Sequence, residues 1–256
     1  RFGAMSGDNF VIGRWLGDGS LGLYTKAYGL MRMPAQYLGE VFSAVLFPAF
    51  SELQNEESRL AAAYLRSTEL AILLSAPVLA GMAVAAPHLV VGLLGPNWEE
   101  SVRPLQILSL VGVLSTAMPL SSSVANAVGR VYAVSLRTGM FAVALLGLGY
   151  LAIPGGINAV SGAVTGAHVI AYILMAGLAL SSLDLSWKRF LDVHRAGFIL
   201  ALEVGVTSAL ARWLLERQGL PSLVILPLLI AVCAGTFWLG VRLLPRSMSP
   251  LPLMRL

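Results

Sequence analysis

The sequence is poor in charge and has a single cysteine. Charged residues make up 12% of the 256 residues and hydrophobic residues 57%, whereas a soluble globular domain has about 25% charged residues. Cys233 has no second thiol to pair with, which excludes a disulfide within this chain and any CxxC metal or redox site. The low share of charged residues and the high share of hydrophobic residues are typical of a membrane protein.

The signatures of common enzymes are also missing. The sequence has no GxxxxGK[ST] run for a nucleotide, no HExxH pair for zinc and no GxSxG nucleophile motif. No cluster of His, Cys, Asp and Glu has the spacing of metal ligands, so we expect no metal and no cofactor. The net charge of +4 is explained by the cations that membrane loops carry, so we expect no nucleic-acid partner. Nothing in the sequence argues for an enzyme.

Long apolar runs are present instead, and they recur along the whole chain. A helix of about 20 apolar residues crosses a bilayer. The runs 70–98, 104–129, 157–183 and 218–241 contain no Asp, Glu, Lys or Arg. Segmentation at charges and at Gly, Pro and Asn predicts an all-α fold, a polytopic bundle of eight membrane helices. The expected helices are 4–17, 21–50, 67–94, 103–128, 133–153, 157–182, 196–215 and 221–243.

The basic residues of the short connections fall mainly on one side of this bundle. Membrane proteins carry an excess of Lys and Arg in their cytoplasmic loops. We therefore expect a multi-pass membrane protein with a cytoplasmic C-terminus. One side collects ten cations, Arg59, Arg66, Arg130, Arg137, Lys188, Arg189, Arg195, Arg242, Arg246 and Arg255, and the other side collects three, Arg103, Arg212 and Arg217.

The expected helix 21–50 carries charge inside an apolar span. At 100° per residue, Lys26, Arg32, Gln36 and Glu40 fall within about one third of the helix circumference. A charge facing lipid at that depth costs at least about 2.5 kcal/mol. Two interpretations follow: the face lines a water-filled substrate pathway, or Arg32 and Glu40 neutralise each other across a packed interface.

Other ionisable residues accompany this face. Arg14 and Asp8, on the short first helix, would extend the same wall, although Asp8 fits the membrane surface equally well. Glu203 is isolated within the expected seventh helix. Because intramembrane carboxylates are rare and often functional, Asp8 and Glu203 are our candidates for ion coupling.

Specific short motifs occupy about the first 130 residues. They are Asp8, LG at 16–17, LGLY at 21–24, Pro34, VLFPAFSEL at 45–53, GPNW at 95–98 and ANAVGR at 125–130. With these motifs the segment resembles the start of the C-terminal half of Wzx-type polysaccharide flippases. That family belongs to the multidrug/oligosaccharidyl-lipid/polysaccharide exporter superfamily.

The resemblance implies a fourteen-helix carrier, of which these would be the last eight helices. Residues 1–182 would then form the C-terminal six-helix lobe, and residues 183–256 would add two helices and a cytoplasmic tail. The chain begins with Arg1 rather than Met, so we expect a fragment that lacks its N-terminal lobe, which would be its partner.

The resemblance also implies a function. Such proteins move undecaprenyl-diphosphate-linked oligosaccharide units across the bacterial inner membrane for O-antigen, capsule or exopolysaccharide assembly, by alternating access. Related lipid II flippases have an acidic–basic doublet where this chain has Tyr28 and Gly29, which favours a polysaccharide unit over lipid II. Arg and Lys suit a diphosphate. The substrate-binding residues would be Arg14, Lys26, Arg32, Gln36 and Glu40.

Three alternatives remain open at the level of sequence. A drug or cation exporter of the same superfamily would bind its substrate through acidic residues, for which Glu40 is the good candidate. A membrane-embedded glycan polymerase, ligase or glycosyltransferase would need a long external catalytic loop, and the expected outer loops are short. A scaffold subunit without transport activity would bury the polar face against neighbouring helices.

Overall fold

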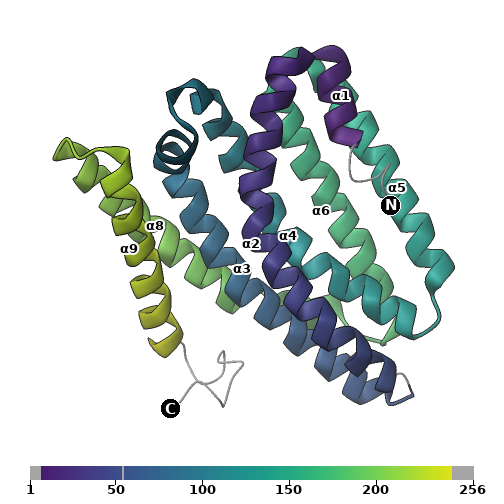
Figure 1. Cartoon of the computed structure of the whole chain (residues 1–256). Coiled ribbons are helices and arrows are strands. Elements are labelled where there is room, and N and C mark those ends of the chain that lie inside the picture. Colours follow the sequence, from purple (N-terminus) through teal and green to yellow (C-terminus); the bar gives the residue numbers. More distant parts are fainter. Residues whose placement is uncertain (1–6, 54, 244–256) are drawn as a thin grey trace.

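The structure, a computed structural model, describes residues 7–53 and 55–243, without the side chains of residues 40–49. Within these ranges every regular element is helical, as Figure 1 shows. The α-helices are α1 (Gly7–Trp15), α2 (Gly17–Glu52), α3 (Glu57–Leu94), α4 (Val102–Ala127), α5 (Val131–Leu151), α6 (Gly156–Ser182), α7 (Trp187–Asp192), α8 (Arg195–Arg217) and α9 (Ser222–Leu243). Two short 3-10 helices, η1 (Pro96–Ser101) and η2 (Ile153–Gly155), precede α4 and α6.

Six helical segments in the described part of the chain are long and apolar enough to cross a membrane. The prediction of an all-α polytopic bundle is therefore confirmed. The described α1 has only nine residues, and the 36-residue α2 is long enough at about 54 Å but more polar. The six segments are Glu57–Leu94, Pro96–Ala127, Val131–Leu151, Ile153–Ser182, Trp187–Arg217 and Ser222–Leu243.

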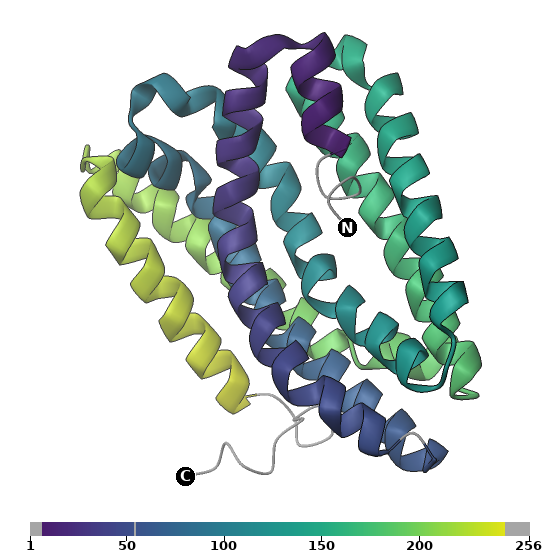
Figure 2. The ribbon, with the colours of Figure 1, turned by 45° about the vertical axis from the view of Figure 1, so that its right-hand side comes forward.

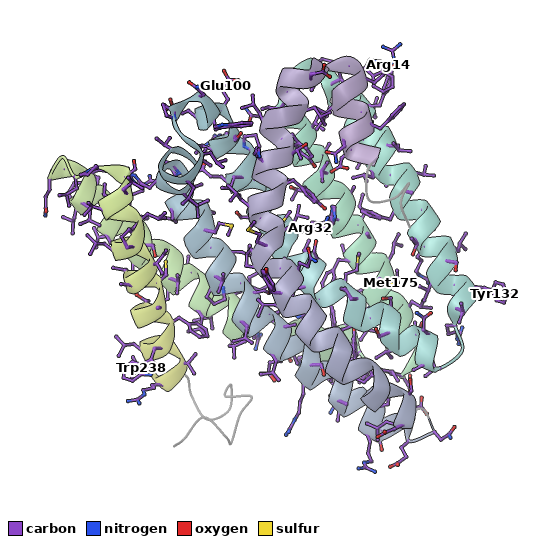
Figure 3. The ribbon with its side chains drawn as sticks, in the orientation of Figure 1. Arg14, Arg32, Glu100, Tyr132, Met175 and Trp238 are labelled. Carbon is purple, nitrogen blue, oxygen red and sulfur yellow. The ribbon has the colours of Figure 1, made fainter. Side chains whose placement is uncertain are left out.

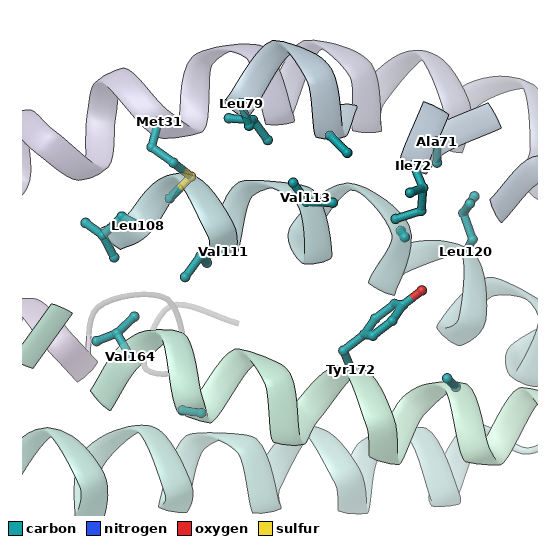
Figure 4. Close-up of a cluster of buried hydrophobic side chains, with 14 of the residues drawn as sticks. Met31, Ala71, Ile72, Leu79, Leu108, Val111, Val113, Leu120, Val164 and Tyr172 are labelled. Carbon is teal, nitrogen blue, oxygen red and sulfur yellow. The ribbon is translucent and has the colours of Figure 1, made fainter. Parts of the chain in front are cut away.

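The centre of the bundle is α4, which packs against α2, α3 and α6. On one side α5 covers α6, and α1 joins α2 to α5; on the other side α8 and α9 pack against α3 (Figures 1 and 2). Met31 of α2, Leu79 of α3, Val111 of α4 and Val164 of α6 meet in the core shown in Figure 4. One face of α2 is therefore fixed by the core.

The start of the third helix differs from the prediction. We expected it at residue 67, but α3 begins at Glu57, and the expected loop between Glu52 and Arg66 is mostly helical. Charged residues mark where a helix leaves the apolar part of a membrane, but they do not end it. Arg59 and Arg66 are exposed on this extension. The end of α2 and the start of α3 therefore run together to the lower edge of Figure 1.

A second difference lies in the expected loop 184–195, which contains the short helix α7. Ser186 caps α7, because its hydroxyl accepts a hydrogen bond from the backbone N–H of Arg189 at 3.4 Å. From α4 to α9, the other long helices begin and end within about two residues of the predicted bounds.

The connections lie at two ends of the bundle. The α2–α3, α4–α5 and α6–α7 connections and the end of α9 lie at one end, which we call the cation-rich end (Figure 1). The α1–α2 junction, η1, η2 and the α8–α9 connection lie at the opposite end. Of the ten cations predicted to share a side, Arg246 and Arg255 lie outside the described residues. That this side is cytoplasmic stays a prediction.

Candidate functional site

The helix α2 has one buried and one exposed face. Tyr24, Ala27, Met31 and Ala35 are buried and recur every three or four residues, the spacing of a single helical stripe. The opposite side exposes Thr25, Met33 and Tyr37 together with four further residues, Lys26, Gly29, Arg32 and Gln36. We call these four residues the α2 face. The predicted clustering of Lys26, Arg32 and Gln36 is therefore observed.

The α2 face differs chemically from the other exposed surfaces of the bundle. At mid-length the exposed side chains of α5, α8 and α9 are apolar, as at Val143, Leu202 and Ile230. Such surfaces suit lipid tails, whereas a cation facing lipid costs at least about 2.5 kcal/mol. Arg32, which lies near mid-length (Figure 3), therefore requires water, polar ligand or further protein beside it, whereas Lys26 lies nearer the end that holds η1.

Local contacts hold the two cations without neutralising them. Arg32 Nε donates a hydrogen bond to Gln36 Oε1 at 3.1 Å, across one helical turn. The Nζ of Lys26 lies 5.4 Å from the ring centre of Trp98 in η1, within the range of a cation–π contact. Among the described side chains, no carboxylate forms an ion pair with either cation. The Glu40 side chain, and hence its predicted pairing with Arg32, lies outside the described residues.

Arg14 and Asp8 are not neighbours of Arg32. Arg14 is exposed at the end of the bundle opposite the cation-rich end, and Arg32 lies near mid-length (Figure 3). Asp8 is buried and accepts a hydrogen bond from Tyr24 Oη at 2.6 Å. Because Tyr24 belongs to the buried stripe of α2, Asp8 faces the interior and not the α2 face. Its role in ion coupling stays a prediction.

Glu203 also lies away from the α2 face. It is half-buried on α8, where its Oε2 would lie 2.7 Å from a Cβ added to Gly240 of α9. The carboxylate thus sits in the contact between α8 and α9. A coupling role for Glu203 stays a prediction as well.

Sequence reasoning missed a polar cluster that joins α8 and α9 to α3. The buried His88 places Nε2 3.1 Å from Glu216 Oε1 and Nδ1 3.2 Å from Ser222 Oγ. Arg212 donates to the Val84 carbonyl at 2.9 Å. Arg212 and Glu216 are four residues apart, which is a visible helical pattern, but no local pattern points to His88. The cluster fixes the α8–α9 pair at the end opposite the cation-rich end.

The segment that contains the α2 face matches a known family. Residues 1–103 match the family model described as "Polysaccharide biosynthesis protein". The predicted resemblance to Wzx-type polysaccharide flippases is confirmed. The match covers α1, α2, α3 and η1, so it includes the positions of Asp8 and of the α2 face, whereas Glu203 lies beyond it.

Relatives with curated names are similar to less than half of the chain. Teichuronic acid biosynthesis protein TuaB of Bacillus subtilis is 31% identical over 123 residues, 48% of this chain and 26% of TuaB. Lipopolysaccharide biosynthesis protein WzxC of Escherichia coli is 31% identical over 113 residues, 44% of this chain and 23% of WzxC. Succinoglycan biosynthesis transport protein ExoT of Rhizobium meliloti is 33% identical over 101 residues, 39% of this chain and 20% of ExoT. The matched segment thus spans about a quarter of the length of these proteins.

The exposure of the α2 face can be measured by cysteine labelling. In a Cys233→Ser background we expect Gly29→Cys to react with a membrane-impermeant thiol reagent roughly tenfold faster than Ala27→Cys, because thiol reactivity follows exposure. An added Cβ at Gly29 meets nothing within 4 Å, so this change should leave the fold intact. Ala27 is fully buried and lies two positions away on the same helix. Equal protection of both cysteines would show that the face is covered, as a scaffold subunit requires.

Proposed function

We propose that this protein is a flippase, which moves undecaprenyl-diphosphate-linked oligosaccharide units across the bacterial inner membrane for the assembly of a polysaccharide. The observation that carries the proposal is the exposed, cationic α2 face in a bundle whose other exposed helices are apolar at mid-length. The family match of residues 1–103 supports a role in polysaccharide biosynthesis.

The α2 face has the chemistry to hold a diphosphate. Arg and Lys donate charge-assisted hydrogen bonds to phosphate oxygens, and these are about twice as strong as neutral ones. The bond from Arg32 Nε to Gln36 orients the guanidinium and leaves its terminal nitrogens, Nη1 and Nη2, to face the substrate. Gly29 lies between Lys26 and Arg32 and has no side chain, so the surface between the two cations is unobstructed.

Transport requires that this face change its exposure. In alternating access, two lobes rock about a site near the middle of the membrane. The N-terminal lobe that the resemblance implies would form the opposite wall of the cavity, and the lipid tail would remain in the bilayer. The membrane potential or an ion gradient would supply the energy, with Asp8 and Glu203 as the candidates for ion coupling. Both lie off the α2 face, so coupling would act through the packing of α1 and α8.

The charge and exposure of the face argue against the alternatives. A cation exporter needs acidic groups in its cavity, and on this side of the helix Glu40 is the candidate, against the two cations Lys26 and Arg32. A scaffold subunit would bury the face against neighbouring helices, whereas the described helices of this chain leave Lys26, Arg32 and Gln36 exposed. A glycan polymerase would need a catalytic loop, whereas η1 and η2 have six and three residues.

The proposal is tested by Lys26→Ala and Arg32→Ala in the complete gene product, expressed as the sole flippase of its pathway. Loss of one charged hydrogen bond costs about 1.5–3 kcal/mol, so we expect polymer export to fall about ten- to hundredfold in each variant. Lipid-linked units should accumulate in the cytoplasmic leaflet. Met33→Ala is the matched control, because Met33 is an exposed, uncharged neighbour on α2. Unchanged export by both cation variants at normal protein levels would refute the assignment.

A further inference from the structure

A groove runs between α6 and α8, on a part of the surface that the α2 face does not reach. α8 packs against α3 and α9, while α6 packs against α4 and α5, so the two helices diverge. The short helix α7 connects them and closes the groove at the cation-rich end. The resulting cavity measures about 750 Å³, and none of its lining residues comes from α2.

The walls of the groove are apolar. Leu114 of α4, Ile173 of α6, Phe190 of α7, and Phe198 and Leu202 of α8 line it. The helices on both sides are long and apolar enough to span a membrane. In a bilayer, the groove would open toward the hydrocarbon layer. If the groove were empty, the side chains that line it would lose dispersion contacts with a neighbouring group. Hydrocarbon chains are the abundant material that can fill it.

Two polar side chains of the lining, Tyr172 and His194, already form hydrogen bonds. Tyr172 Oη lies 2.7 Å from His194 Nε2, and His194 Nδ1 lies 2.7 Å from the Phe190 carbonyl. Both ring nitrogens of His194 are therefore used. Because this pair offers no spare hydrogen-bond donor to the groove and the walls are apolar, the interior suits an apolar chain and not a sugar.

Cations flank the groove where it reaches the cation-rich end. Arg195 belongs to the lining, and Lys188 is exposed on α7 about 60° around the helix from the lining residue Leu191. Asp192 forms an exposed ion pair with Arg195 at 3.2 Å and offsets part of this charge. Among the described residues Lys188 has no ion-pair partner. From Arg195 to Leu202 the groove follows α8 for about 10 Å, so cations stand at one end of an apolar slot.

We propose that this groove is a binding site for an anionic phospholipid of the leaflet at the cation-rich end. Its acyl chains lie against Phe198 and Leu202, and its headgroup phosphate contacts Lys188 and Arg195. The lipid fills the space between α6 and α8 and so holds the α8–α9 pair in place beside the bundle. This proposal does not depend on the proposed transport function, because the groove and the α2 face share no residue.

Native mass spectrometry of the complete gene product, purified and mixed with phosphatidylglycerol, tests the site. We expect the unaltered protein to retain phosphatidylglycerol and the double variant Lys188→Ala/Arg195→Ala to retain at least roughly fivefold less, since each charge near an anionic lipid contributes about 1 kcal/mol. Leu202→Trp, which fills the groove, should lose the lipid to a similar extent. Gel filtration checks that each variant is folded.

Two matched controls isolate the site. Arg189→Ala removes a cation from the other side of α7, about 160° from Leu191, and should retain the lipid. Leu210→Trp adds the same bulk to an exposed position of α8 outside the groove and should also retain it. Equal retention of phosphatidylcholine, or a loss that is the same in controls and groove variants, would overturn the proposal. Displacement of phosphatidylglycerol by undecaprenyl phosphate at the groove would also overturn it, because the occupant would then be the substrate's lipid.

Discussion

Arg32→Glu in the complete gene product is expected to lower polymer export at least about hundredfold. The substitution removes the guanidinium donors, each worth about 1.5–3 kcal/mol toward a charged acceptor, and places a carboxylate beside the diphosphate. Because about 1.4 kcal/mol corresponds to a tenfold change in rate, loss of attraction and gain of repulsion together exceed a factor of a hundred. Quantification of surface polymer, normalised to the amount of flippase in the membrane, measures the effect.

Arg32→Lys provides the control for this charge reversal. It keeps the positive charge but loses the planar pair of donors that matches phosphate oxygens, so export should fall by roughly tenfold and not be abolished. Polymer export that decreases in the order Arg, Lys, Ala, Glu at position 32 is expected for an anionic substrate. A cation exporter would instead be unaffected or improved by Arg32→Glu, and that result would reject the diphosphate assignment.

Gly197→Leu is expected to separate α8 from α3 and to lower the unfolding temperature by roughly 2–12 °C. A Cβ added at Gly197 would lie 2.8 Å from both the carbonyl carbon and the oxygen of Ile72. Backbone atoms inside a helix cannot rotate away as a side chain can, so the helices must move apart. Overpacking of this kind costs about 1–3 kcal/mol, and each kilocalorie shifts the midpoint by about 2–4 °C in a chain of this size. Temperature-dependent gel filtration in detergent measures the change.

Gly205→Leu is the matched control for the helix contact. Gly205 lies on the same helix, eight residues further along, and an added Cβ there meets nothing within 4 Å. This variant should unfold at the temperature of the unaltered protein. Equal unfolding temperatures of the two variants would contradict the close contact between α8 and α3 at Gly197.

Local patterns in the sequence predict most of the helices and the composition of the α2 face. The charge-free runs mark the long helices, and the 100° rotation per residue alone places Lys26, Arg32 and Gln36 on one side of α2. Neither the charge-free runs nor the helical rotation locates the helix ends near the edges of the membrane. The charged start of α3 at Glu57 and the short helix α7 were expected to be loops, because charge shows where a segment leaves lipid and not where its backbone hydrogen bonds stop.

By itself the sequence determined that this protein is a helical membrane protein with two unequally charged ends and a polar face on one helix, because composition and periodicity are properties of neighbouring residues. Only the tertiary structure decided that this face points away from the core, that Asp8 turns inward to Tyr24, and that His88 meets Glu216 across 128 residues. Each of these depends on which helices pack together, and helices in lipid associate through small residues and close contacts. Such contacts, like that of Gly197 with Ile72, leave no periodic trace in the sequence.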